Sequence, residues 1–327
     1  MSAYRIGVTF ASALLAAIAG SPAARAQSPY PNHPVMLIVP YGAGGVADVG
    51  MRILGEQLSQ RLKQQFVIEN KPGAGGIIAA QAGASAAPDG YTLLMTGNNN
   101  AIAAALFNKL PYNILTDFAS VSTAAFFDLL LVTRAGSSLK SLKDVIAAAK
   151  ANPGKLNIGT IVPGSTQNLA AELFTSTAGI KATIVTFRTS PDMAGAVLRG
   201  DIDVAFEFYA AIQGLLSDHK IVALASTGTK RTAYLPDVPT VVESGIKGYD
   251  VASWNGLAVP AATPKPIIAT LNAAMKDVIP MPVVATRSNQ MGMEMRWSTP
   301  EEMTTRMKDD IAKWGAVITT AGVPKRD

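Results

Sequence analysis

Residues 35–62 read VMLIVPYGAGGVADVGMRILGEQLSQRL. The apolar run Val35–Val39 predicts a buried strand, which Pro40 and the glycines after it end. From Val46 onward, apolar residues recur at spacings of three and four, as on one face of a helix. The stretch is therefore a strand, a glycine turn and a helix N-terminus in succession.

A turn of this kind is suited to binding an anion. The first N–H groups of a helix have no partners inside the helix, and they carry the positive end of its dipole. Gly42, Gly44 and Gly45 would allow a carboxylate or phosphate to approach these groups closely. On this stretch alone, an anion site and a tight turn that binds nothing are about equally well supported.

The first 26 residues resemble a secretory signal peptide. Arg5 supplies the positive start, Gly7–Gly20 is uncharged and largely apolar, and Ala24-Arg25-Ala26 is a cleavage site with Gln27 as the new N-terminus. The apolar run is shorter than the roughly 20 residues that a membrane span needs. We therefore expect export to the periplasm rather than an ordinary N-terminal helix.

The composition of the chain limits the kinds of function that it can have. The 327 residues suffice for two α/β domains, and with 49% apolar and 16% charged residues the chain is globular. Without Arg5 and Arg25, 26 basic residues against 23 acidic ones give a net charge of +3, which is too small to indicate nucleic-acid binding. There is no cysteine, and an exported protein of this size can form its core without disulfides.

The pattern of strand, turn and helix recurs along the chain. Strands are expected at residues 66–69, 92–95, 129–133 and 156–159. Asn98–Asn100 follows the second of these as a polar loop, whose side chains could cap and turn the chain or face a ligand. This alternation is typical of an α/β protein with largely parallel sheets. We predict that residues 27–130 and 251–327 form one lobe and residues 131–250 the other, with two crossings near 128–132 and 249–252.

Catalytic and metal-binding chemistry is scarce. The two histidines, His33 and His219, lack metal-ligand spacing, so neither a metal nor a cofactor is expected. Ser165 follows Gly164 but lacks the flanking glycines of a hydrolase elbow, which favours a helix cap or a ligand donor over a nucleophile. A protein that binds a ligand without converting it is therefore the simplest interpretation.

Two arginines lie near the expected turns, and their surroundings predict different roles. Arg52 lies four residues after Asp48 near the start of the first helix, and this spacing predicts a surface or dipole-favoured pair. Arg188 follows a strand among small polar residues, where its guanidinium could bind a carboxylate with two hydrogen bonds. A rim arginine in solvent is the alternative for Arg188.

Five motifs in this order carry a resemblance to a known family. They are residues 38–45, IVPYGAGG, with Asp48 and Arg52; 69–76, ENKPGAGG; 88–93, PDGYTL; 153–156, PGKL; and 235–240, LPDVPT, with Glu243 and Gly245. The chain resembles the extracytoplasmic solute-binding receptors of the tripartite tricarboxylate transporter family, also called Bug receptors. The resemblance covers Tyr30 to Ala321.

The resemblance implies an α/β type II periplasmic-binding-protein fold, in which two lobes joined by two crossing strands close on a ligand. It also implies a small carboxylate ligand: a di- or tricarboxylate, an acidic amino acid or an aromatic acid. The ligand residues carried over from the family motifs are Tyr41, Gly44, Gly45, Val46, Ala47, Asn98, Asn99, Thr160, Ser165, Thr166, Arg188, Thr189 and Glu207.

The second lobe departs from the family pattern at three places, and these departures concern ligand choice rather than fold. Many members have Tyr-Lys/Arg-Gly where this chain has Phe187-Arg188-Thr189, His where it has Asn168, and Asp where it has Glu207.

Three functions remain open at this point. The first is a monomeric periplasmic receptor that delivers a carboxylate to the membrane permease of a tripartite tricarboxylate transporter. The second is an orphan sensor that presents the solute to a membrane sensor kinase. The third is an exported hydrolase using Ser165, which the missing machinery disfavours.

Overall fold

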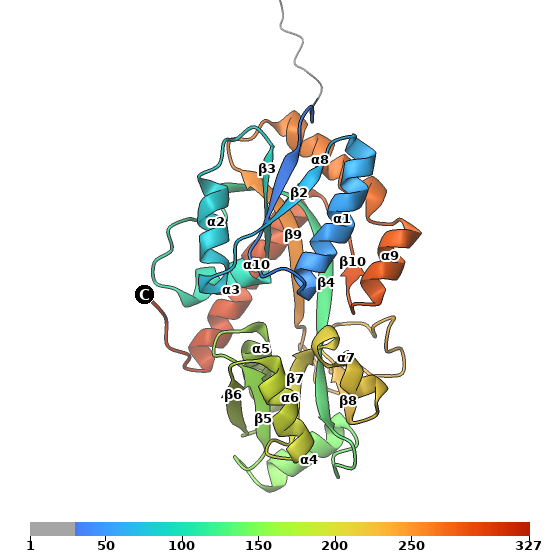
Figure 1. Ribbon diagram of the computed structural model, residues 1–327. Coiled ribbons are helices and arrows are strands. Elements are labelled where there is room, and N and C mark those ends of the chain that lie inside the picture. The colour runs from blue at the N-terminus through green and yellow to red at the C-terminus, as the bar shows by residue number, and fades with distance from the viewer. Residues whose placement is uncertain (1–29) are drawn as a thin grey trace, which may run out of the picture.

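Two lobes lie one above the other in the computed structural model, which describes residues 30–327 (Figure 1). The predicted signal peptide, residues 1–26, lies outside the described residues. The upper lobe contains β1 (Val35–Val39), α1 (Val46–Leu62), β2 (Phe66–Asn70), α2 (Ile77–Ala84), β3 (Thr92–Gly97), α3 (Asn98–Leu106), β9 (Ala252–Pro260), α8 (Lys265–Val278), α9 (Pro282–Asn289), β10 (Glu294–Met295) and α10 (Pro300–Thr320).

The lower lobe contains the middle of the chain. A long strand, β4 (Phe118–Arg134), leads into it from the upper lobe. Its other elements are α4 (Leu142–Ala151), β5 (Asn157–Ile161), α5 (Thr166–Ala178), β6 (Thr183–Phe187), α6 (Ser190–Arg199), β7 (Val204–Phe208), α7 (Tyr209–Ser217) and β8 (Ile221–Ser226).

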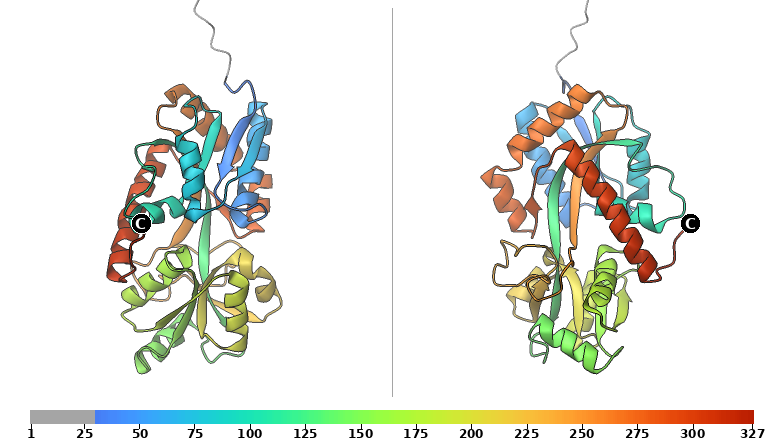
Figure 2. Two further views of the ribbon diagram at one scale, coloured as in Figure 1. Left: turned by 60° about the vertical axis from the view of Figure 1, so that its left-hand side comes forward. Right: turned by 180° about the vertical axis from the view of Figure 1, so that it is seen from behind.

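The strands of the two lobes are hydrogen-bonded in the order β2-β1-β3-β9-β4-β7-β5-β6, with β8 and β10 also paired to β4. Within each lobe the strands that lead into helices run parallel: β1 with β2 and β3, and β5 with β6 and β7. The parallel sheets expected from the alternating pattern are confirmed, and helices cover their faces (Figure 2).

Strand β4 connects the lobes by changing its partner. It pairs with β9 as far as Asp128, which lies opposite Ala252, and pairs with β7 and β8 from Leu129 onward. The expected strand began only at Leu129, so the prediction missed its first eleven residues. Those residues are almost all buried, and a strand buried on both faces lacks the alternation by which strands are recognised.

The C-terminal helix α10 ties the upper core together. The sequence Thr299-Pro300-Glu301-Glu302 predicts a capping box with proline at the first helical position. This prediction is confirmed, because Thr299 caps α10, Pro300 begins it and Glu302 completes the box. The indole N–H of Trp254 donates to Asp310 at 2.6 Å, and that of Trp314 donates to Asn98 at 2.7 Å. Both tryptophans are fully buried, so each indole N–H has the partner that burial requires.

Within residues 30–327, no single helix is long and apolar enough to cross a membrane. Helices α8 and α9 meet the length and composition only when taken together, across a bend of 75°.

Candidate functional site

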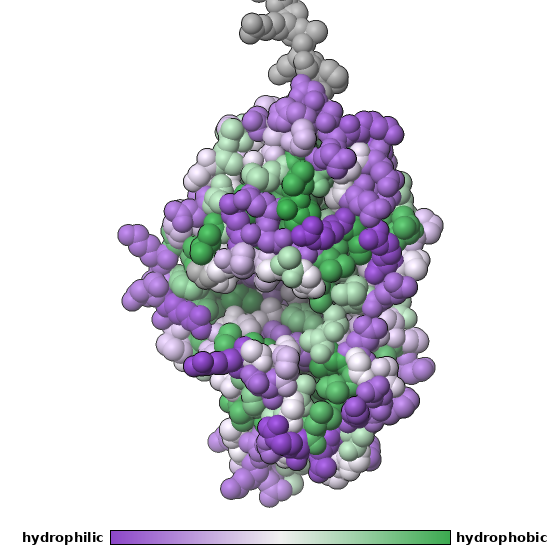
Figure 3. Space-filling view, viewed as in Figure 1, coloured by the Kyte–Doolittle hydropathy of each residue, from purple (hydrophilic) through white to green (hydrophobic). Residues whose placement is uncertain are grey.

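The carboxyl ends of the parallel strands in both lobes point towards the space between the lobes (Figure 1). The molecular surface is hollowed there, and apolar residues gather in and beside the hollow (Figure 3). In open α/β sheets, ligands bind beyond the carboxyl ends of the strands. This cleft is the candidate site.

Each lobe presents the same turn to the cleft. Gly44 and Gly164 have positive φ angles of 84° and 79°, which favour glycine, and each is followed by the N-cap of a helix. The caps Gly45 and Ser165 have nearly equal backbone angles, φ −72° and ψ 162° against φ −71° and ψ 161°. The loops before α1 and α5 are therefore two copies of one turn geometry.

A side chain four residues after the glycine holds each turn in place. The N–H of Gly44 donates to Asp48 Oδ2 at 2.8 Å, and that of Gly164 donates to Asn168 Oδ1 at 2.9 Å. Asn168, one of the departures from the family pattern, thus acts on its own loop.

The predicted pair of Asp48 and Arg52 is present in the first turns of α1, with Arg52 exposed, but its acidic member does not lie at the surface. The Asp48 side chain is fully buried, and it accepts hydrogen bonds from Gly44, from Arg52 Nε at 2.8 Å and from Asn70 Nδ2 at 2.8 Å. Burial alone would raise the pKa of the Asp48 carboxyl, but the hydrogen bonds from Arg52, Gly44 and Asn70 outweigh it and lower the pKa. Asn70 also donates to the carbonyl of Tyr41, so the network joins two glycine loops.

The upper face of the cleft offers backbone donors and open space. Helix α1 begins at Gly45 without a side-chain cap, which leaves its first N–H groups, including those of Val46 and Ala47, free of a capping side chain. A Cβ atom placed on Gly42 or Gly44 would meet no atom within 4 Å. An anion could therefore reach the N-terminus of α1.

Tyr41 lies directly before the first glycine of the upper turn and is 38% exposed. Desolvation by the surrounding protein raises the pKa of its phenol to about 12. The side chain thus remains a neutral hydrogen-bond donor at physiological pH.

The lower face of the cleft has fewer polar groups available to a ligand than the sequence predicted. Ser165 Oγ accepts the N–H of Asn168 at 3.1 Å, so its own proton remains available to a ligand. Arg188 is exposed, which fits both a carboxylate-binding arginine and a rim arginine in solvent. The Thr189 hydroxyl caps α6 and donates to Asp192 at 2.7 Å, so its proton is already used.

Four of the predicted ligand residues are buried or engaged with protein groups. Thr160 is fully buried and donates to the carbonyl of Ile161. Glu207 is buried and accepts from Gln167 Nε2 at 3.0 Å and from the N–H of Phe208 at 2.7 Å. Burial raises the pKa of the Glu207 carboxyl, and hydrogen bonds from Ser190, Phe208 and Gln167 offset part of that rise. The other two are Asn98 and Thr166.

Asn98 bridges the lobes instead of facing solvent. It accepts from Trp314 in the upper lobe and donates through Nδ2 to Thr166 Oγ1 of the lower lobe at 2.9 Å. The expected polar loop at Asn98–Asn100 is also wrong, because these residues form the first turn of α3. The Oδ1 atom of Asn100 accepts a hydrogen bond from the N–H of Gly97, the residue before the helix, so the three asparagines begin a helix. Asn99 Oδ1 is buried without a partner among the described residues.

The start of α7 was missed by sequence reasoning. Its N-cap is Phe208, which provides no side-chain hydrogen bond, so α7 is a second helix at the cleft whose first turn lacks a side-chain cap. Its β7–α7 junction contains no glycine or N-capping residue, and no local signal marks it as a binding loop.

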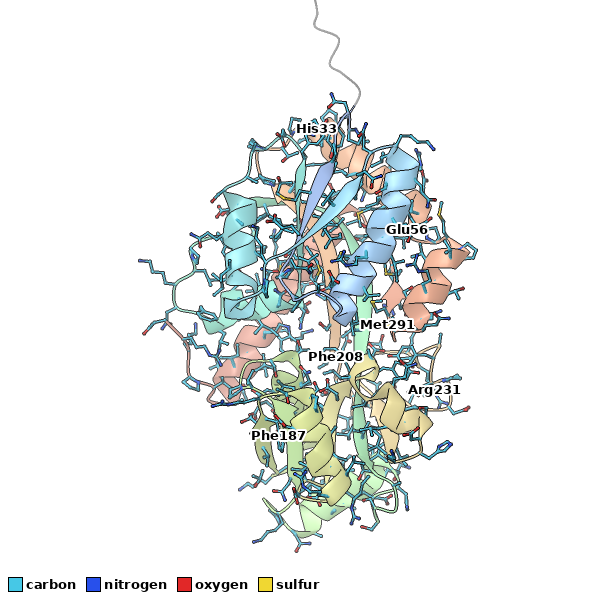
Figure 4. All side chains as sticks on the ribbon, in the orientation of Figure 1. His33, Glu56, Phe187, Phe208, Arg231 and Met291 are labelled. Carbon is cyan, nitrogen blue, oxygen red and sulfur yellow. The ribbon has the colours of Figure 1, made fainter. Side chains whose placement is uncertain are left out.

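The side chains that commonly bind metal ions do not cluster within residues 30–327. No three His, Cys, Asp or Glu side chains of this part come together as a metal site. Both histidines are exposed; His33 stacks on Tyr91 at the far end of the upper lobe (Figure 4).

Comparison with known proteins identifies the family. The sequence model of the tripartite tricarboxylate transporter family receptor matches residues 51–323. A UPF0065 protein from the TAR-I ttuE-ttuC' intergenic region of Agrobacterium vitis is 32% identical, with 91% of this chain and 87% of that protein covered. BugT of Bordetella pertussis is 30% identical, with 94% of each chain covered.

Solved structures agree in fold. Rpa4515 of R. palustris, solved with adipate, has a TM-score of 0.78 at 30% identity and covers 91% of this chain and all of that one. MatC from Rhodopseudomonas palustris, with bound malate, has a TM-score of 0.73 at 30% identity and covers 88% of this chain and all of that one. The chain therefore belongs to the tripartite tricarboxylate transporter receptor (TctC or Bug) family of periplasmic solute-binding proteins, which are not enzymes.

Proposed function

We propose that this protein captures a small carboxylate in the periplasm by closing its lobes and delivers it to the permease of a tripartite tricarboxylate transporter. The observation that carries the proposal is the pair of matching turns, one from each lobe, on opposite sides of the cleft. Relatives solved with adipate and with malate support a carboxylate ligand. The signal-like leader ending at Ala26 supports the periplasmic location.

The two lobes supply different groups to the anion. The upper lobe offers the N–H groups and dipole of α1, together with the Tyr41 hydroxyl. The lower lobe offers the Ser165 hydroxyl and the exposed Arg188 guanidinium. A ligand that touches both sets stabilises the closed state more than the open one, which is the condition for closure on binding.

Carboxylates should bind and compact the protein. In a thermal-shift experiment on the mature chain, a ligand at 100 times its Kd adds about 2.7 kcal/mol to the free energy of unfolding. Adipate and malate are the first probes, followed by a wider set of organic acids. Small-angle scattering at saturation should then show a smaller radius of gyration. If no organic acid raises the melting temperature, the proposal fails; binding without compaction would remove lobe closure from it.

Replacing Ser165 by alanine should weaken carboxylate binding without abolishing folding. A hydrogen bond to a charged group contributes about 1.5–3 kcal/mol, so we expect a loss of roughly 10- to 150-fold in affinity by calorimetry. The variant also loses a helix cap, which costs about 1 kcal/mol of stability.

Ser141→Ala is the matched control for the lost cap. Ser141 caps α4 in the same way, by accepting the N–H of the residue three positions on. It should lower stability by a similar amount and leave affinity unchanged. Equal affinities of the two variants would exclude Ser165 as a ligand donor.

A further inference from the structure

An apolar cluster spans the floor of the cleft and draws on both lobes. Its buried members include Phe127 of β4, and the partly buried Val46 and Val49 of α1, Met291 of the upper lobe and Phe208 of the lower lobe pack against the cluster. Phe127 and Phe208 meet edge to face, with ring centroids 6.3 Å apart. Met291 and Phe208 lie on facing sides of the gap between the lobes (Figure 4).

This cluster adjoins the anion-binding turn. Val46 is the first residue of α1, directly after the cap Gly45, and Phe208 is the cap of α7. Val46, Val49, Met291 and Phe208 are only partly buried, so each retains carbon surface in contact with solvent. A carboxylate at the start of α1 would therefore place the rest of its molecule beside apolar side chains.

Polar partners for the body of a ligand are few by comparison. Among the predicted ligand residues of the lower lobe, Thr160 and Glu207 are buried, Thr189 caps α6 and Thr166 is bonded to Asn98. Val162, which precedes the turn at Gly164, adds a 43% exposed apolar side chain from the same loop. A hydroxyl buried against this floor without a partner would lose its hydrogen bonds to water.

We propose that the ligand is a carboxylic acid with an unhydroxylated hydrocarbon body, which lies on Val46, Phe127 and Phe208 while its carboxylate binds the N-terminus of α1. This inference rests on the proposed function and specifies the ligand class. It is based on two observations. The N-terminus of α1 has no side-chain cap and can bind a carboxylate, and the side chains of the cluster beside it are apolar.

Acids that differ only in hydroxyl groups test the proposal directly. Adipate and galactarate have the same six-carbon chain and two carboxylates, but galactarate carries four hydroxyls. Benzoate and 3,4,5-trihydroxybenzoate are the corresponding pair for a ring. We expect adipate or benzoate to bind at least tenfold more tightly than its hydroxylated partner in calorimetry, and the pair with the larger ratio shows whether the floor takes a chain or a ring.

Phe208→Ser and Phe208→Leu separate ligand contact from lobe packing. Serine is a good N-cap, so Phe208→Ser retains the start of α7 while removing the ring. It should reduce the preference for the unhydroxylated acid at least fivefold, and Phe208→Leu should retain most of it.

The possible failures are distinguishable. If none of the four acids nor any other carboxylate binds, the proposed function itself fails. If galactarate or trihydroxybenzoate binds as tightly as its partner, only the hydrocarbon-body inference is overturned. It is also overturned if Phe208→Ser weakens both members of a pair equally, since the cluster would then serve only to pack the lobes.

Discussion

Replacing Gly97 by alanine is expected to destabilise the protein by at least about 3 kcal/mol, a large part of the 5–15 kcal/mol that a folded chain typically has. A Cβ atom on Gly97 would lie 2.1 Å from the carbonyl oxygen of Trp254 and 3.0 Å from its carbonyl carbon. Both atoms belong to the backbone of β9, which pairs with β3 at this point, so a side-chain rotation cannot relieve the overlap.

We also expect Gly97→Ala to disturb the hydrogen bonds of Asn98 that connect the two lobes. Gly97 precedes Asn98, which connects Trp314 to Thr166, so a shift of β3 away from β9 would move all three contacts. Chemical denaturation of the purified variant measures the first effect. Calorimetric titration with the best carboxylate measures the second, at a temperature where the variant is folded.

Gly315→Ala is the matched control for Gly97→Ala. Gly315 lies inside α10, and a Cβ atom there would meet nothing within 4 Å. Alanine is favoured over glycine in a helix by about 1 kcal/mol, so this variant should be slightly more stable than the parent. Two variants of equal stability would contradict the close contact between Gly97 and Trp254.

Asp128→Asn should stabilise the protein at pH 8 and have little effect near pH 4. Asp128 lies where β4 passes between the lobes. The pKa of its carboxyl is raised to about 7, chiefly by burial; Arg296 acts to lower it, and Asp250 and Glu294 contribute to the rise. No hydrogen bond to this carboxylate is formed by the described residues.

The direction of the pH dependence follows from the raised pKa. Between about pH 4 and 7 the folded state holds a proton at Asp128 that the unfolded chain has released, so this group lowers stability as the pH rises through that range. Above pH 7 the full cost of a desolvated carboxylate is present. Asparagine does not titrate, and we expect a gain on the order of 2 kcal/mol at pH 8, below a ceiling of about 4 kcal/mol.

Asp277→Asn controls for a general effect of removing a carboxylate. The Asp277 side chain is 49% exposed and pairs with Arg61 at the surface, where an ion pair contributes at most about 1 kcal/mol. Denaturant unfolding at pH 4, 6 and 8 should show a stability difference that grows with pH for Asp128→Asn only. A difference independent of pH would mean that Asp128 titrates at an ordinary pKa.

Most elements of the fold could be predicted because their signals are local. The strand at Val35–Val39, the helix start at Val46 and the capping box at Thr299 depend on residues that are neighbours in the sequence. The predicted lobe boundaries remain a prediction, and the partner change of β4 at Asp128 and Leu129 lies within the expected crossing at 128–132.

The errors share a different physical cause. Asp48 has the spacing of a surface ion pair, and only the packing of β2 beside β1 brings Asn70 close enough to bury it in a network. Asn98 lies in a polar tripeptide, and only the position of α10 makes it an acceptor for Trp314. Contacts between residues 22 or 216 positions apart leave no periodic trace in the chain.

The sequence by itself determined the family, the α/β class and the two glycine turns, because strand and helix periodicity and the need for glycine at positive φ are properties of short segments. Only the tertiary structure decided which predicted ligand groups remain available. Among residues 30–327, the N-terminus of α1, Tyr41, Ser165 and Arg188 keep hydrogen-bond donors that no protein group accepts, whereas Asn98, Thr160, Thr166, Thr189 and Glu207 are bonded to protein partners. Hydrogen-bond partners are chosen among all groups that folding brings together, so availability at a site is settled by long-range packing rather than by local spacing.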